Sequence, residues 1–311
     1  MRVKMLPLIA TAAIAIGLVA APAATADPAP GTTYYLSLGD SLAAGYQPAP
    51  PPGGDTDRGY ANVIYNTLKA KEPGLQLEKL GCDGETTTSM IKGNTCPYPS
   101  ATSQLDAAKK FLAAHKGQVK YVTINIGAND IYHCINGSGT GSLGSSGVPD
   151  VGCITSELAT INTNLNSIDK QVRAAGGETP RYVGMNYYNP ALAGWIKGGL
   201  SRVEADATAV LNNLLSATIV QANIANGFRT ADVLSAFSNN DFGNFENVPP
   251  YGSLPRNVAR ICQWTWMCSM NNIHANDQGY QVIADTFLPL LTSSGTGSSM
   301  SSTGSAGSSG S

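Results

Sequence analysis

Short apolar runs alternate along the chain with longer segments of periodic hydrophobicity. The runs are rich in β-branched and aromatic residues and predict strands at Tyr34–Leu38, Leu75–Leu80, Val119–Ile126, Arg181–Tyr187 and Phe228–Ala231. The periodic segments predict helices at Tyr60–Ala70, Ser103–His115, Ser156–Ala175, Ser201–Ala225 and Asp277–Leu291. In the fourth helix the apolar residues that recur at helical spacing are Val203, Ala207, Val210, Leu211, Leu214 and Leu215.

The strand–helix alternation predicts an α/β protein. A parallel sheet of about five strands would carry helices on both faces, which makes a three-layer α/β/α sandwich in one domain over residues 27–292. Residues 136–149 are rich in Gly and Ser and predict a flexible loop, and residues 293–311 predict a disordered Ser/Gly-rich tail.

The first 26 residues have the pattern of a secretory signal peptide. Arg2 and Lys4 precede an apolar run from residue 6 to 21, and Ala24-Thr25-Ala26 forms a small-residue cleavage site. A retained membrane anchor is the alternative, but the run is short for a spanning helix. We therefore expect a secreted, extracellular protein without stable membrane insertion.

The charge balance argues against several classes of partner. The formal net charge is −2 and only 13% of residues are charged, which provides no basic surface for nucleic acid. The three histidines, His115, His133 and His274, are scattered, and no Cys-x-x-Cys pair exists. We expect no metal, no cofactor and no nucleic acid, and a monomer whose partner is an ester or lipid substrate.

Six cysteines in an exported chain suggest three disulfides, although six cysteines allow about fifteen pairings. Proximity in the sequence favours three short loops, closed by Cys82–Cys96, Cys134–Cys153 and Cys262–Cys268.

The chemistry begins where the first predicted strand ends, at Gly39-Asp40-Ser41-Leu42. Ligands of α/β sheets bind outside the carboxyl ends of the strands, so a serine there is a candidate nucleophile. Gly39 would allow a sharp turn, and Asp40 could accept backbone N–H bonds that fix it. Taken alone, Ser41 is more simply an N-cap of the next helix.

Three later segments change that judgement: Gly81-Cys82-Asp83-Gly84, Gly127-Ala128-Asn129-Asp130 and His274-Ala275-Asn276-Asp277-Gln278-Gly279-Tyr280. In this order, and with Ser41 first, the set resembles the GDSL or SGNH hydrolase family, and most of all its secreted actinobacterial esterases and lipases with three disulfides. The resemblance implies a flavodoxin-like fold and a serine esterase or lipase.

The same resemblance implies the roles of four residues. Ser41 would be the nucleophile and His274 the base, while the Ser41 N–H, Gly84 and Asn129 would form the oxyanion hole. Gly84 and Asn129 could equally be ordinary turn residues, and Gly81 is close enough to be confused with Gly84.

Asn271 departs from the family pattern, which usually has Asp three residues before the histidine. Three interpretations compete: a backbone carbonyl, most simply that of Asn271, orients His274; a carboxylate such as Asp277 substitutes; or activity is lost. We favour the carbonyl of Asn271, because Asp277 suits the cap of the last helix. Asn271→Ala should then retain most activity.

Aromatic residues suggest the substrate class. Trp264, Trp266 and Met267 precede the base, and Tyr187 and Tyr188 follow the fourth strand, so they could form an apolar acyl wall or plain core. The absence of charged anchors favours a neutral carboxylic ester. The alternatives are a carbohydrate acetyl esterase and a non-catalytic surface-binding protein with a vestigial site.

Overall fold

The computed structural model describes residues 31–136 and 151–293. The predicted signal peptide, nearly all of the Gly/Ser-rich segment and the tail from residue 294 lie outside these residues. By its internal contacts the chain divides after Gly31, and the fold below belongs to the unit that begins at Thr32.

Five parallel strands form the central sheet in the order β2–β1–β3–β4–β5. The strands are β1 (Thr33–Gly39), β2 (Leu75–Lys79), β3 (Val119–Asn125), β4 (Arg181–Met185) and β5 (Arg229–Ala231). Ser37 in β1 pairs with Lys79 on one side and with Thr123 on the other. All five predicted strands are confirmed to within two residues at each end.

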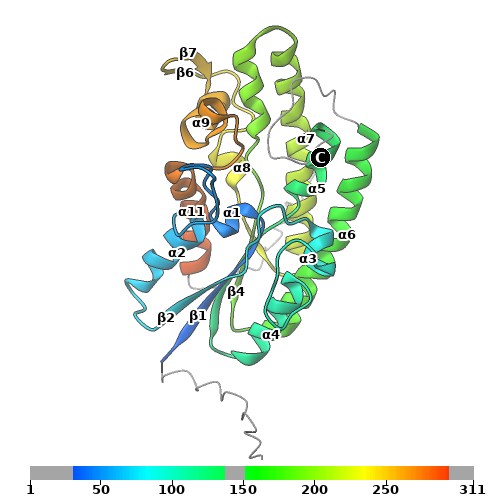
Figure 1. Ribbon diagram of the computed structural model, residues 1–311, viewed down its shortest axis with the longest axis vertical. Coiled ribbons are helices and arrows are strands. Elements are labelled where there is room, and N and C mark those ends of the chain that lie inside the picture. The colour runs from blue at the N-terminus through cyan, green and yellow to red at the C-terminus, as the bar shows by residue number, and fades with distance from the viewer. Residues whose placement is uncertain (1–30, 137–150, 294–311) are drawn as a thin grey trace, which may run out of the picture. The chain divides into compact units, whose positions relative to one another are not determined.

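Helices cover both faces of this sheet (Figure 1). On one face, α2 (Tyr60–Lys69) packs against α11 (Asp277–Thr292). The other face carries α3 (Thr87–Lys92), α4 (Gln104–Ala114), α6 (Val151–Gly176) and α7 (Gly199–Ala225). The three-layer α/β/α fold is confirmed, and α6 begins five residues earlier than its apolar periodicity indicated.

Several short elements escape the sequence pattern, and they gather around the carboxyl ends of the strands. They are α1 (Ser41–Ala44), α5 (Ala128–Asn136), the 3₁₀ helix η1 (Pro190–Lys197), α8 (Val233–Ala236), the hairpin β6–β7 (Phe245–Val248 and Gly252–Pro255), α9 (Arg256–Trp264) and α10 (Met267–Met270). The four-residue helices α1, α8 and α10 have too few positions to show a hydrophobic period, so tertiary contacts set them.

Three disulfides are present, and their pairing confirms the prediction from proximity: Cys82–Cys96, Cys134–Cys153 and Cys262–Cys268. Each closes a loop of 6 to 19 residues, which in a chain-entropy model stabilises the fold by roughly 2–3 kcal/mol. None of the helices over residues 31–136 and 151–293 has the length and apolarity needed to cross a membrane.

Candidate active site

The order of the strands in the sheet by itself indicates where a ligand would bind. The chain runs from β1 outward to β2 and then returns past β1 to β3, so β1 and β3 flank the point where the winding reverses. A crevice forms outside the carboxyl ends of two such strands and is where α/β sheets bind ligands. Ser41 directly follows β1 and Asn129 closely follows β3, so the topology brings them to the same crevice.

The turn at the end of β1 presents Ser41 as the first residue of α1. Gly39 has a φ of +135°, and a Cβ there would lie 2.1 Å from the backbone oxygen of Asn125 on the neighbouring strand. Only glycine permits this approach. Asp40 then caps α1, since its Oδ1 accepts the backbone N–H of Leu42 at 2.9 Å. The prediction that Asp40 fixes the turn is confirmed.

Asp40 also anchors a buried hydrogen-bond network that the sequence did not reveal. Its carboxylate accepts Asn125 Nδ2 and the Tyr187 hydroxyl, each at 2.6 Å, and the Tyr60 hydroxyl donates to Asn125 Oδ1 at 2.6 Å. Burial raises the pKa of Asp40 to about 7, and the hydrogen bonds from Tyr187 and Leu42 oppose that rise. The network joins the ends of β1, β3 and β4, so it holds the Ser41 turn rigidly.

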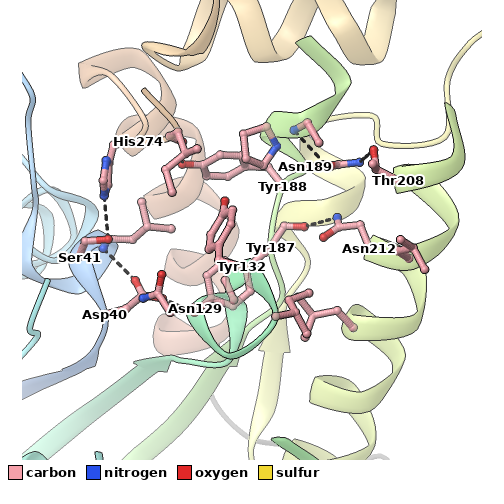
Figure 2. Close-up of a pocket in the computed structure, with 18 residues that line it drawn as sticks. Asp40, Ser41, Asn129, Tyr132, Tyr187, Tyr188, Asn189, Thr208, Asn212 and His274 are labelled. Atoms are coloured by element: carbon pink, nitrogen blue, oxygen red, sulfur yellow. Dashed lines mark hydrogen bonds between the residues drawn. The ribbon is translucent and has the colours of Figure 1, made fainter. Parts of the chain in front are cut away.

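His274 lies directly opposite Ser41 (Figure 2). The Ser41 Oγ and the His274 Nε2 are 2.8 Å apart, and both residues are buried. Burial lowers the pKa of His274 to about 4, so the imidazole is neutral near pH 7. A neutral imidazole can accept the Ser41 proton, which is the arrangement that activates a serine.

The orienting group of His274 is the side chain of Asn272, and the prediction of the Asn271 carbonyl is thereby corrected. Asn272 Oδ1 lies 2.8 Å from His274 Nδ1 and also accepts the backbone N–H of His274 at 3.1 Å. Because that N–H can only donate, the oxygen faces the ring and Nδ1 must carry the proton. This tautomer leaves Nε2 free to accept from Ser41.

Asn271 instead terminates α10, where it adopts a left-handed conformation with φ of 50°. Asp277 is no substitute acid, since its carboxylate pairs with Arg58 at 3.3 Å and accepts Gln47 Nε2 at 3.3 Å. The predicted cap also moves by one residue, because Asn276 caps α11 by accepting the Gly279 N–H. The group that orients the His274 ring is therefore the uncharged side chain of Asn272, whose oxygen also forms a local Asx turn with the His274 backbone N–H.

The two remaining oxyanion candidates differ in position. Asn129 is half-buried beside Ser41, and its Nδ2 donates one hydrogen bond to the backbone oxygen of Glu85 at 2.9 Å. An amide nitrogen has two protons, so a second donor remains for a ligand. Gly84 is exposed and is not among the residues that line the pocket, and its N–H interacts with the Asp83 carboxylate.

Gln104 couples the Gly84 segment to the nucleophile turn, and no sequence signal identified it. Its side-chain amide pairs with both groups of Gly39, accepting the N–H at 2.6 Å and donating to the carbonyl at 2.9 Å. The same Nε2 donates to Glu85 Oε2 at 3.0 Å. All three residues are buried or tightly packed, so the position of Ser41 depends on a glutamine 63 residues further along the chain.

A pocket extends from the Ser41–His274 pair toward α7, with an empty volume of about 720 Å³ that includes the part open to solvent. Its walls are mostly apolar and aromatic: they include Ile131, Tyr132, Tyr187, Tyr188, Pro190, Leu211, Leu215 and Ile273. Figure 2 shows Thr208 and Asn212 of α7 on the side away from His274. Such a pocket suits an apolar chain with a reacting group at one end.

Only part of the predicted aromatic wall lines this pocket. Tyr187 and Tyr188 do, and their hydroxyls are engaged with Asp40 and with the Ile273 carbonyl. Trp264, Trp266 and Met267 do not. The Trp266 indole donates to Gln47 Oε1 at 2.6 Å, and Trp264 packs edge-on against Phe237, so their role is to support the segment that carries His274.

The fold and this site define a class: α/β/α proteins with a serine–histidine pair at the carboxyl edge of a parallel sheet. The model of the GDSL-like lipase/acylhydrolase family matches residues 37–282, and the chain belongs to that family. The family resemblance inferred from the four segments is thereby confirmed.

Solved structures with a similar fold share little sequence with the chain. An extracellular lipase from Streptomyces rimosus is 16% identical, covers 84% of this chain and 98% of its own, and has a TM-score of 0.47. An acetylxylan esterase from Geobacillus stearothermophilus is 15% identical, with coverages of 85% and 96% and a TM-score of 0.49. A phospholipase A1 from Streptomyces albidoflavus is 16% identical, with coverages of 84% and 98% and a TM-score of 0.49. No curated protein matches the chain.

Proposed function

We propose that the protein is a secreted serine esterase or lipase that cleaves neutral carboxylic esters with an apolar acyl group. The observation that carries this proposal is the 2.8 Å contact of Ser41 Oγ with a neutral His274 at one end of a mostly apolar pocket. Of the described residues that line this pocket, Asp40 and His274 are the titratable ones besides tyrosine, so no cation is present to hold a charged substrate.

The reaction proceeds in two halves. Ser41 Oγ attacks the ester carbonyl carbon while its proton moves to His274 Nε2, and the imidazolium formed is held by Asn272 Oδ1 through Nδ1–H. The C–O bond to the alcohol then breaks, and His274 returns the proton to that alcohol. Water attacks the acyl-serine with the same proton transfers, releasing the acid and restoring Ser41 Oγ–H.

The oxyanion of each tetrahedral intermediate needs donors that are in place beforehand. We assign Asn129 Nδ2 and the Ser41 backbone N–H as donors, because Asn129 and Ser41 line the same pocket. The third donor in this proposal is the Gly84 N–H, which interacts with the Asp83 carboxylate and is assigned on the family resemblance. Gly84→Ala retains the N–H but strains a backbone with φ of +75°, so it tests whether the loop must keep this conformation, with kcat measured apart from KM.

The decisive experiment is hydrolysis of p-nitrophenyl acetate, butyrate and decanoate by the wild type, Ser41→Ala and His274→Ala. Both variants should lose nearly all activity while melting at the wild-type temperature. Butyrate and decanoate should exceed acetate in kcat/KM, because a longer chain fills the apolar pocket. No turnover by folded wild type, together with no labelling by a fluorophosphonate, would refute the proposal and leave a vestigial site.

We further infer that residues 1–26 direct export and are removed. Three disulfides support export, because such bonds persist in oxidising compartments. Intact mass of the protein recovered from culture medium should begin at Asp27, and a mass that retains Met1 would contradict the cleavage.

A further inference from the structure

The outward face of α7 is apolar. Val203, Val210 and Leu214 are 62%, 61% and 50% exposed. Together with the exposed Ala207 and Ala217, they lie along one face at helical spacing, and we call these five residues the α7 stripe. The buried face combines Leu215 and Ile219 with small and polar side chains, among them Ala205, Ala209, Ser216 and Asn223, so apolar residues lie on both faces of the helix.

The stripe is also free of charge. Val203 has Arg202, Glu204 and Asp206 as neighbours, but no Asp, Glu, Lys or Arg occurs from residue 207 to 228, so the exposed face of α7 is uncharged for about five turns from Ala207 onward. A helix on a protein surface normally carries charged residues toward water, and a continuous apolar face there marks an interaction site. From Ala207 onward the face is uncharged, so it attracts a partner through apolar contact rather than through charge.

The stripe meets the rim of the candidate active site. Thr208, Leu211, Asn212 and Leu215 of the same helix line the pocket. Leu211 is only half-buried and is the neighbour in sequence of the exposed Val210, so the pocket wall reaches the surface beside the stripe. Whatever covers the stripe therefore lies on the same helix as this wall of the pocket.

We propose that the α7 stripe adsorbs to the surface of aggregated uncharged lipid and so presents the pocket to esters at that surface. The proposal rests on the esterase function proposed above. Protein–protein interfaces are usually anchored by Trp, Tyr or Arg, and the stripe contains only Val, Leu and Ala. A lipid surface requires apolar area alone, and an adsorbed helix face buries its apolar side chains at the headgroup boundary.

A binding experiment that does not depend on catalysis tests this surface. Ser41→Ala protein is mixed with phosphatidylcholine vesicles or a triolein emulsion, and the bound fraction is measured by flotation. Adding Val203→Ser, Val210→Ser and Leu214→Ser should weaken partitioning by about 10-fold or more, because three apolar side chains lose their burial. Phe245→Ser is the matched control, since Phe245 is 56% exposed but lies on β6, and it should leave partitioning unchanged.

Two further measurements separate the possible outcomes. In the active protein, the triple substitution should slow hydrolysis of emulsified esters and leave that of dissolved p-nitrophenyl acetate unchanged. Raising the salt concentration should not release the protein from vesicles, because the stripe carries no charge. The absence of ester hydrolysis and of fluorophosphonate labelling in the wild type would refute the esterase function, whereas the flotation result would stand independently.

Three results would overturn the lipid proposal. The first is no binding of Ser41→Ala protein to either lipid surface, and the second is equal binding of the triple variant. The third is a lipid-free dimer, seen by light scattering, that the triple substitution converts to a monomer, which would assign the stripe to a second copy of the chain.

Discussion

Asn272 should control both the rate and the pH dependence of the reaction. Its Oδ1 accepts the Nδ1–H of His274 at 2.8 Å and the backbone N–H at 3.1 Å. Asn272→Ala removes both hydrogen bonds, each worth about 0.5–1.5 kcal/mol. If that free energy is lost in the transition state, kcat should fall about 10- to 100-fold, since each 1.4 kcal/mol is about tenfold. KM should hardly change, because Asn272 does not line the pocket.

Asn272→Asp distinguishes an orienting role from a merely structural one. The change places a carboxylate where the amide oxygen stands, 2.8 Å from Nδ1. A nearby opposite charge raises the pKa of an imidazole by roughly 1–3 units. In the wild type, burial lowers the pKa of His274 to about 4, so kcat/KM should fall only near that pH as the base is protonated. In Asn272→Asp the acid limb should move upward, with kcat near neutral pH equal to or above that of the wild type.

The assay is the pH profile of kcat/KM for p-nitrophenyl butyrate between about pH 3 and 8, with the melting temperature measured at each pH. Asn271→Ala is the control, because Asn271 ends α10 and should leave the profile unchanged. A wild-type rate in Asn272→Ala, or an acid limb in Asn272→Asp that does not move, would refute the role of Asn272.

Three further predictions concern the proposed oxyanion donor Asn129, the buried glutamine Gln104 and the buried carboxyl group of Asp169. Asn129→Ala should lower kcat by about 100- to 1,000-fold with little change in KM, because an oxyanion donor is lost. Single-turnover kinetics measures the chemical step, and weaker substrate binding with an unchanged chemical step would argue against this role. Gln104→Leu should lower the free energy of unfolding by about 1–3 kcal/mol, since the buried Gly39 N–H loses this acceptor. The Gly39 carbonyl keeps the Cys82 N–H, and the Glu85 carboxylate keeps Ser89 and Tyr98. Urea titration measures the change, and wild-type stability would contradict it. Asp169 is buried, with no hydrogen-bond partner for either oxygen within residues 31–136 and 151–293, and burial raises its pKa from 3.8 to about 8. The folded state therefore holds this proton more tightly than the unfolded chain, and the group's contribution to stability is complete below about pH 4 and is lost as the pH rises through about 8. Asp169→Asn should melt higher than the wild type by a margin that grows between those pH values, and a margin independent of pH would show that the carboxyl is not responsible.

The sequence predicted what depends on neighbours along the chain. Strands such as Val119–Asn125 are continuous apolar runs, and long helices have enough turns to show a period. The turn at Gly39-Asp40-Ser41 was likewise predictable, because the conformational freedom of glycine and the capping by Asp are local properties. The four family segments then identified the residues that the fold brings to one crevice.

The features that the sequence did not reveal depend on contacts between residues far apart in the chain, or on which face of a helix other elements cover. Gln104 and Tyr187 contact the Ser41 turn from 65 and 147 residues away, and nothing in their local pattern indicates this. Asn272 was missed because the family position drew attention to Asn271 one residue earlier. Helical spacing grouped Val203, Val210 and Leu214, but spacing shows only that residues share a face and not that this face is buried.

The two ends of the described domain lie at the same edge of the sheet. β1 begins at Thr33, and Ser293, just after α11, accepts a hydrogen bond at 2.9 Å from Arg229, the first residue of β5. Both are amino ends of parallel strands, whereas Ser41, Asn129 and the pocket occupy the carboxyl ends. A fusion partner or a covalent link to a solid support can therefore be placed at either end without standing in front of the pocket, which suits the protein to display or immobilisation in a fixed orientation.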